Sequence, residues 1–302
     1  MKVRIRFSKQ GSAKFIGHLD VMRYFQKVMR RAEVSIRYSG GFSPHQIMSF
    51  AAPLGVGITS NGEYLDIEVE DMEDLSTMKE RMDQTMAEGF RVESCRRLPD
   101  KADNAMSIVA AAAYTVSFRP GYEPEDPKKW LQELEAFYGR EHIPITKKTK
   151  KGYKELDLKP LVYTLQVRDA HVYMLLSAGS AENVKPELVL DAFYQSRGEE
   201  RPPFAFLIQR EDVYAEQPDG EDPKARRPED IHGGTGVYNG RRFISLEELG
   251  EGGEEALTEG EETVHGKADH HPLGAVHMHR SGCGPEDPPA QSGTGGNGTE
   301  AQ

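Results

Sequence analysis

The 302-residue sequence has few cysteines and no long apolar run, and each absence excludes a class of protein. Its two cysteines, Cys95 and Cys283, lie far apart, so we expect no structural disulfide and a reducing, cytoplasmic location. Two cysteines are also too few to hold an iron–sulfur cluster. Because no stretch of about 18 apolar residues occurs, we expect no membrane span. The alternating start, MKVRIRFSKQ, does not resemble a signal peptide.

Acidic residues are scarce at the start of the chain. Residues 1–50 carry ten Lys and Arg side chains against two acids, Asp20 and Glu33. Residues 1–215 have no net charge, so the formal charge of -11 comes from residues 216–302, which carry 7 basic and 18 acidic side chains. This asymmetry predicts that the N-terminal segment faces an anionic partner.

Residues 216–302 are rich in Gly, Glu and Pro and poor in large apolar side chains, so we expect a disordered acidic tail. Only Phe243–Leu249 has the composition of a short helical turn. The tail also carries scattered histidines (His265, His270, His271, His277 and His279), for which we expect no dedicated metal site. No phosphate-binding or dinucleotide-binding glycine motif occurs, and we expect no cofactor.

The remaining chain divides into two units of similar pattern, residues 1–100 and 106–215. Period-2 and period-3.6 apolar patterns predict strands and helices in the order strand-helix-strand-strand-helix-strand. In the first unit these are 2–8, 18–32, 34–38, 64–70, 75–88 and 90–98, with an extended apolar insertion at 47–58. In the second they are 112–118, 128–138, a strand at 143–147, a hairpin of 159–167 with 171–177, and then 186–196 and 204–215. We therefore expect an α+β fold with two tandem ferredoxin-like (split βαβ) units.

The helix predicted at 18–32 has two opposite faces. Its apolar stripe consists of Leu19, Met22, Phe25 and Met29. Its basic stripe consists of Arg23, Lys27, Arg30 and Arg31, and Arg37 follows just beyond it. A solvated helix face is the plain alternative. Because acids are scarce nearby, we favour a row of phosphate-binding side chains, and RNA rather than DNA is the expected partner.

Two histidines lie close to this stripe in the sequence. His18 opens the helix, where the positive end of the helix dipole disfavours the charged imidazole. His45 closes the loop Ser39–His45, whose paired glycines permit a tight turn. With Tyr38 they are the candidates for a catalytic role, although a capping or packing role fits His18 as well, and the Ser39–His45 segment fits an ordinary loop. Phe42 in the loop could stack on an unpaired base or be buried.

A second basic element lies in the second unit. Four lysines, Lys147, Lys148, Lys150 and Lys151, precede Gly152 between a predicted strand and the next element. They predict a flexible basic finger that contacts phosphates without reading bases. An ordinary solvated loop is the alternative.

Over residues 14–70, from KFIGHLDVMRYFQ through SGGFSPHQ to YLDIEVE, the sequence resembles the radical-SAM-linked protein family. This is a bacterial domain of unknown function that occurs beside or fused to cobalamin-binding radical SAM proteins. The likeness extends more loosely to Tyr214 and includes KKTKKG, Asp157 and Pro160, whereas Ser43 stands where the family commonly has Asn. The resemblance implies a radical SAM partner and no established reaction. The predicted halves are also similar, at the level of fold, to CRISPR repeat-processing endoribonucleases.

Three functions are consistent with this pattern. The first is a non-catalytic RNA-binding accessory protein that presents tRNA or rRNA to a separate radical SAM enzyme for modification or processing. The second is a protein-only adaptor of such an enzyme, docking through the segment 42–53 and the acidic tail. The third is a metal-independent endoribonuclease, in which His18 and His45 exchange protons and Tyr38 assists. We rank them in that order.

Overall fold

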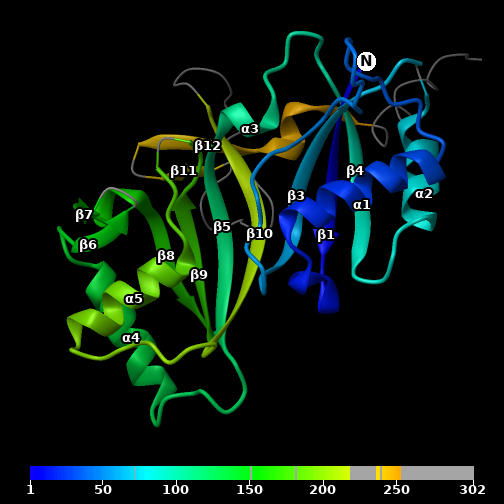
Figure 1. The fold of residues 1–302 in the computed structure, drawn as a ribbon. Helices are drawn as coiled ribbons and strands as arrows, with labels where there is room; N and C mark the ends of the chain where they lie inside the picture. Colours follow the sequence, from blue (N-terminus) through cyan, green and yellow to red (C-terminus); the bar gives the residue numbers. More distant parts are fainter. Residues whose placement is uncertain (72, 150–151, 181, 218–235, 239, 253–302) are drawn as a thin grey trace, which may run out of the picture. The chain divides into compact units, whose positions relative to one another are not determined.

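A computed structural model describes residues 1–71, 73–149, 152–180, 182–217, 236–238 and 240–252 of the protein (Figure 1). All of them belong to one structural unit, Met1–Thr258. The architecture is mixed α+β, as predicted: a few helices pack on an 11-stranded, mostly antiparallel sheet, and a two-stranded hairpin forms a sheet of its own.

The first half contains β1 (Lys2–Lys9), α1 (His18–Arg31), β2 (Met48–Phe50), β3 (Thr59–Glu68), α2 (Leu75–Gln84) and β4 (Phe90–Leu98). The strands lie in the order β4-β1-β3, with β2 on the C-terminal part of β3, and all of these pairs are antiparallel. In β1, Val3, Ile5 and Phe7 alternate with arginines and are fully buried in the core under α1 and α2. Burial of each such side chain contributes roughly 1.5–3 kcal/mol, which explains why the period-2 pattern specifies this strand.

The strand predicted at 34–38 is not formed. Ile36 and Tyr38 make only isolated bridges, to Val69 and Gln46, and β2 lies instead in the segment predicted as an insertion. The reason is competition for one edge: Met48–Phe50 pairs with Leu65–Ile67 of β3, which leaves only the end of that strand for the earlier segment.

The second half contains β5 (Val109–Phe118), α4 (Pro127–Tyr138), β6 (Pro144–Thr149), β7 (Gly152–Asp157), β8 (Val162–Arg168), β9 (His171–Ser177), α5 (Pro186–Ser196) and β10 (Phe206–Gln217). The main strands lie in the antiparallel order β10-β5-β9-β8, and β6 and β7 form the separate hairpin. A short helix, α3 (Ala105–Ile108), links the halves.

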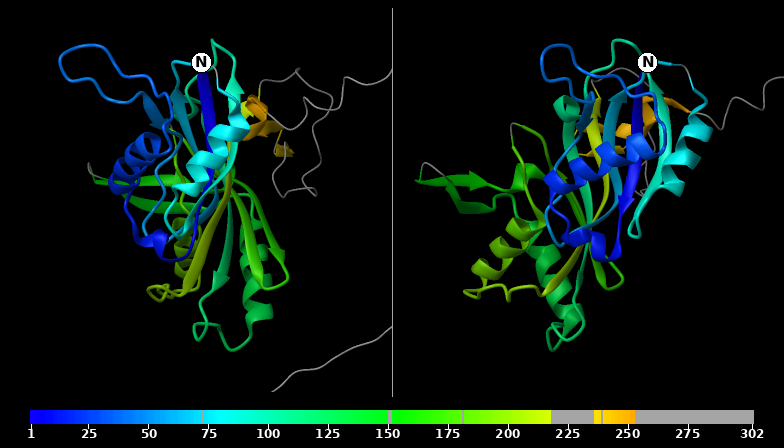
Figure 2. Two further views of the ribbon diagram at one scale, coloured as in Figure 1. Left: turned by 90° about the vertical axis from the view of Figure 1, so that its right-hand side faces the viewer. Right: turned by 45° about the vertical axis from the view of Figure 1, so that its right-hand side comes forward.

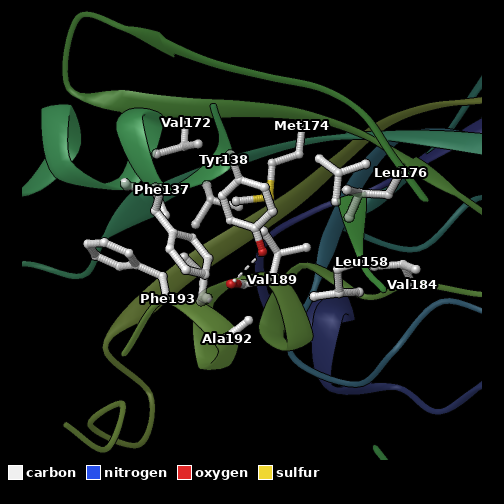
Figure 3. Packing of buried hydrophobic residues seen from close by; sticks show 14 of the residues in the cluster. Phe137, Tyr138, Leu158, Val172, Met174, Leu176, Val184, Val189, Ala192 and Phe193 are labelled. Carbon is white, nitrogen blue, oxygen red and sulfur yellow. Dashed lines mark hydrogen bonds between the residues drawn. The ribbon is translucent and has the colours of Figure 1, made fainter. Parts of the chain in front are cut away.

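The core of the second half lies between α4, α5 and the sheet (Figure 3). Phe137 and Phe193 meet there with ring centroids 5.7 Å apart. The hydroxyl of Tyr138 donates to the carbonyl oxygen of Val189 at 2.9 Å, so this polar group is satisfied inside the core. Burial raises the pKa of Tyr138 well above its ordinary value.

The two halves share the sheet through β3 and β10. Thr59 and Ser60 pair in parallel with Gln209 and Arg210. A Cβ on Gly62 would lie 2.6 Å from the carbonyl oxygen of Glu211, so only glycine permits this close approach. The strands of the two halves therefore form one continuous sheet.

The predicted disordered tail is wrong for its described residues. Residues 216–217 belong to β10, and the chain then forms β11 (Gly236–Tyr238), β12 (Arg241–Ser245), a 3-10 turn (Leu246–Leu249) and β13 (Glu251–Gly252). β12 pairs with β10 and β13 with β4. Phe243 and Leu246 are fully buried, so two apolar side chains dock an otherwise polar segment on a preformed sheet. Residues 218–235, 239 and 253–302, including the tail histidines and Cys283, lie outside the described residues.

Candidate nucleic-acid interface

Helix α1 presents the predicted basic face. It begins at His18 after Gly17, which provides no side-chain cap. Val21, Phe25, Val28 and Met29 are its buried residues. The predicted apolar stripe was therefore wrong at Leu19, which is 68% exposed because the first turn extends past the sheet core. Asp20 does not cap the helix either, since its carboxylate pairs with Arg23 at 3.3 Å.

The predicted basic side chains are all exposed, namely Arg23, Lys27, Arg30, Arg31 and Arg37. Three of them have weak partners at the surface. Arg23 pairs with Asp20, Arg37 with Glu68 at 3.4 Å, and Arg31 donates to the carbonyl oxygen of Thr85 at 3.3 Å.

The side chains of Lys27 and Arg30 form no hydrogen bond or ion pair with any residue that the structure describes. Exposed pairs such as Arg23–Asp20 contribute at most about 1 kcal/mol and exchange readily with other anions. The centre of the α1 face is therefore an unneutralised positive surface.

The loop Ser39–His45 projects from the sheet between α1 and β2, as both views of Figure 2 show. Its base is closed by three hydrogen bonds between Ser39 and His45, including Oγ to Nδ1 at 2.8 Å. Gly41 has a φ of +100°, which favours glycine. Phe42 is fully exposed at the tip, so the alternative of a buried Phe42 was wrong.

The structure does not bring the candidate catalytic residues together. At the base of the loop Tyr38 pairs with Gln46, the residue after His45, and the side-chain amide of Gln46 donates to the hydroxyl of Tyr38. The same amide donates to the carbonyl oxygen of Gln26, eight residues along α1 from His18. Since an α-helix rises about 1.5 Å per residue, the Gln46 contact lies about 12 Å along the helix axis from His18, and no hydrogen bond or ring contact among the described residues joins His18 to His45.

His18 lies in a different environment. Its ring packs edge-on against Phe50 with centroids 5.4 Å apart. Burial lowers the pKa of the His18 imidazole; Glu63 opposes this change and Lys9 adds to it. His18 is therefore a neutral, half-buried histidine that packs against the core.

The predicted lysine finger is a β-hairpin rather than a loop. Lys147 and Lys148 belong to β6 and pair through the backbone with Lys154 and Tyr153 of β7. Lys150 and Lys151 lie outside the described residues. At the base of the hairpin, Asp157 accepts hydrogen bonds from His142, Ile143 and Lys159, and these lower its pKa. The alternating residues 144–149 pair with 152–157, which the sequence pattern did not reveal.

Several basic residues of the N-terminal segment are not at the surface at all. Arg4 is 1% exposed and binds Asp66 through two hydrogen bonds of 2.8 and 3.0 Å. Lys9 is also buried and donates to the carbonyl oxygen of Ile16. Arg6 pairs with Glu247 at 2.7 Å. Burial favours the neutral acid of Glu247, but the pKa of this carboxyl is lowered, with the hydrogen bond and positive charge of Arg6 opposing the effect of burial.

A second buried network joins the halves and has no signal in the sequence. Arg210 forms a two-pronged ion pair with Glu63 and donates to the carbonyl oxygen of Ala52 at 2.9 Å. Nearby, Asp212 accepts from the hydroxyls of Tyr64 and Ser245, and burial raises its pKa. These partners lie up to 158 residues apart, so no local pattern predicts them.

Comparison with known protein families identifies the family of this chain. The model of a family described as uncharacterized proteins conserved in bacteria (DUF2344) covers residues 2–186, more than half of the chain. None of the curated proteins matches the sequence. Within the described residues, no helix is long and apolar enough to cross a membrane, and no group of three His, Cys, Asp or Glu side chains is arranged to hold a metal.

Proposed function

Because the chain belongs to the DUF2344 family of uncharacterized proteins conserved in bacteria, we propose its function from its own surface, as an RNA-binding accessory protein that works with a separate radical SAM enzyme. The unneutralised basic face of α1 is the observation that carries this proposal. The radical SAM partner and the RNA-modification context rest on the resemblance over residues 14–70 alone.

The spacing of the face suits a phosphate backbone. Arg23, Lys27 and Arg30 follow one side of α1, and the first and last of them are about 10 Å apart along the helix axis. A single phosphate occupies only part of that length, so the row fits a polyanion. An arginine guanidinium can donate two parallel hydrogen bonds to one phosphate group, which adds directional specificity to the charge attraction.

The Ser39–His45 loop adds an aromatic side chain to the basic face. Phe42 is fully exposed at its tip, and a hydrophobic ring held in water gains free energy when it stacks on a base. Only unpaired bases offer such a face, since the bases of a duplex are already stacked. We therefore favour RNA with single-stranded segments over duplex RNA or DNA.

The two halves also support a fold assignment for this role. Apart from the β6–β7 hairpin inserted in the second half, each half runs strand-helix-strand-strand-helix-strand, and the strand orders β4-β1-β3-β2 and β10-β5-β9-β8 correspond position by position. We propose that these are two tandem ferredoxin-like units. The endoribonuclease alternative requires His18 and His45 to share a phosphate, and their different surroundings do not favour it, because His18 packs on Phe50 whereas His45 bonds Ser39 at the base of the loop.

Binding of total bacterial RNA to the full chain, measured by filter retention at 50 and 200 mM salt, tests the proposal. The triple variant Arg23→Glu, Lys27→Glu, Arg30→Glu should lose at least about tenfold in affinity, and its salt slope should fall by about 2 because three contacts are lost. A matched control reverses three exposed lysines elsewhere, Lys101, Lys128 and Lys129, with the same change in net charge. Equal losses in both variants, or no salt-dependent binding by the wild type, would contradict the proposal.

A protein-only adaptor is the second candidate, and one observation favours it. Phe15 and Leu19, at the start of α1, are 67% and 68% exposed, as is usual for side chains that dock on a partner. Co-purification of a radical SAM protein that survives nuclease and 1 M salt, and that Leu19→Asp abolishes, would favour this function over RNA binding.

A further inference from the structure

A cavity of about 310 Å³ lies where the two halves meet. No residue of α1 lines it. On the first half its wall is the apolar loop Ala51–Gly55 with Ile58. On the second half it is lined by the turn after β9 and by the start of α5. A volume of this size lies at the lower end of the range for small-molecule sites, which occur preferentially at such junctions.

The sheet topology explains why the cavity is there. Strand β3 pairs with β2 along Leu65–Ile67 and with β10 at Thr59 and Ser60, so one edge serves two partners. The loop between β2 and β3 spans the fork between them. The far wall is held in place at Gly179, where φ is +124° and a Cβ would lie 2.3 Å from the carbonyl oxygen of Val109. The wall is therefore set by backbone rather than by adjustable side chains.

Of the polar groups that line the cavity, Arg210 and Tyr114 are buried and already engaged, whereas Ser180, Asn183 and Lys185 are exposed. The guanidinium of Arg210 is bound by Glu63 and by the carbonyl oxygen of Ala52. Tyr114 is hydrogen-bonded to Arg210, and its pKa is raised by burial, with the negative charges of Glu63 and Glu187 adding to the effect. Because its buried cation is neutralised, the inner end of the cavity does not offer a site for an anion.

Glu187 differs from these groups. It lines the cavity from the first turn of α5, where the helix dipole stabilises a carboxylate. Its Oε2 atom is shielded from solvent and has no hydrogen-bond partner among the described residues. An orphaned carboxylate oxygen beside an apolar wall costs free energy unless a donor reaches it.

We propose that this cavity binds a small primary amine with an apolar body, the ammonium group donating to Glu187 and the body packing on Ile58, Met106 and the Ala51–Gly55 loop. The proposal is independent of RNA binding, because none of these residues belongs to α1 or to the Ser39–His45 loop. It differs from an anion site in the sign of the ligand, which gives a sharp test.

The test is methyl NMR on the full chain labelled at Met and Ile methyl groups, with n-hexylammonium as the probe and 1-hexanol and hexanoate as matched probes of the same length. The methyl signals of Met106 and Ile58 should shift saturably with hexylammonium, with a Kd of about 1 mM, as expected for a ligand of so few atoms. Hexanol should bind about tenfold more weakly, and hexanoate more weakly still.

Two variants make the result decisive. Glu187→Gln should lower the affinity for hexylammonium about tenfold and leave hexanol unchanged, whereas Glu141→Gln, at an exposed site elsewhere, should change neither. Met106→Trp should fill the mouth and weaken both probes. The proposal fails if no probe gives a saturable shift at these methyl groups, if hexanoate binds as well as hexylammonium, or if Glu187→Gln binds like the wild type.

Discussion

Helices α1 and α4 occupy corresponding positions, each following the first strand of its half, but their surfaces differ in kind. The exposed face of α1 is basic, and Lys27 and Arg30 have no ion pair among the described residues. On α4 the cation Lys129 has an ion pair within the helix, with Glu133, and Glu133 also pairs with Arg197 at the end of α5. The same scaffold therefore carries one face that is neutralised internally and one that is left for an external anion.

The helix beginnings differ in the same sense. Asp126 caps α4 by accepting from the backbone N–H of Lys129 at 3.0 Å. Gly17 precedes α1 without a side-chain cap, so the first N–H groups of α1 stay available. The positive end of the α1 dipole thus adds to the basic face, whereas that of α4 is satisfied locally.

The largest predicted effect comes from the buried ion pair between Glu63 of β3 and Arg210 of β10, the two strands through which the halves share their sheet. Glu63→Gln leaves Arg210 buried beside a neutral amide, and breaking a buried ion pair in this way costs about 3–5 kcal/mol. Urea unfolding of the full chain measures it. Glu68→Gln is the matched control, because its pair with Arg37 is exposed and contributes at most about 1 kcal/mol. Equal changes in the unfolding free energy of the two variants would show that the Glu63–Arg210 pair is not a main determinant of stability.

The next prediction concerns the exposed ring of Phe42 and its binding to single-stranded RNA. Phe42→Ala should leave the unfolding free energy unchanged, because the ring is fully exposed, and should weaken binding of single-stranded RNA by about tenfold, the worth of one stacked base. Fluorescence anisotropy with a single-stranded and a duplex oligonucleotide measures both affinities. Tyr122→Ala removes an exposed aromatic ring near the start of α4 and should have no effect. An equal loss for the duplex would contradict stacking.

A smaller effect tests the two helix beginnings. Asp126→Ala removes the cap of α4 and should lower the free energy of unfolding by about 1 kcal/mol. Gly17→Ala should lower it by less than Asp126→Ala does, because no side-chain hydrogen bond is lost at Gly17. Thermal unfolding of both variants provides the comparison, which would be refuted by a larger loss at Gly17.

The smallest effect concerns pH and the second half. Hydrogen bonds from His142, Ile143 and Lys159 lower the pKa of Asp157 in the folded protein. A carboxyl whose folded pKa is depressed stabilises the fold above its ordinary pKa, and this contribution is lost as the pH falls through the folded value. Thermal unfolding between pH 7 and 3 should therefore show a smaller acid-induced loss for Asp157→Asn than for the wild type. Identical pH profiles would contradict this role.

Local patterns explain which features the sequence could predict. Helix α1 and its basic face follow from 3.6-residue periodicity, and β1 follows from strict alternation of apolar and basic side chains. The segment 240–252 escaped prediction because its polar composition hides two anchors, Phe243 and Leu246, whose docking surface is formed by distant strands. Composition alone registers the charge of Glu247 but not its pairing with Arg6, 241 residues away.

The candidate site divides along the same line. Exposure of Arg23, Lys27 and Arg30 could be predicted, since helix geometry determines which face they share. The separation of His18 from His45 could not, because it depends on how β2 passes along α1. The cavity beside Glu187 was likewise invisible, since its walls come from segments more than 120 residues apart.

Ultraviolet crosslinking in cells, followed by identification of the crosslinked peptides and RNA, tests the central claim most directly. We predict RNA adducts on α1 and on the Ser39–His45 loop, with Phe42 among the modified residues, and none on α4. Absence of crosslinked RNA, or adducts on α4 as frequent as those on α1, would contradict the assignment of the basic face as an RNA-binding surface.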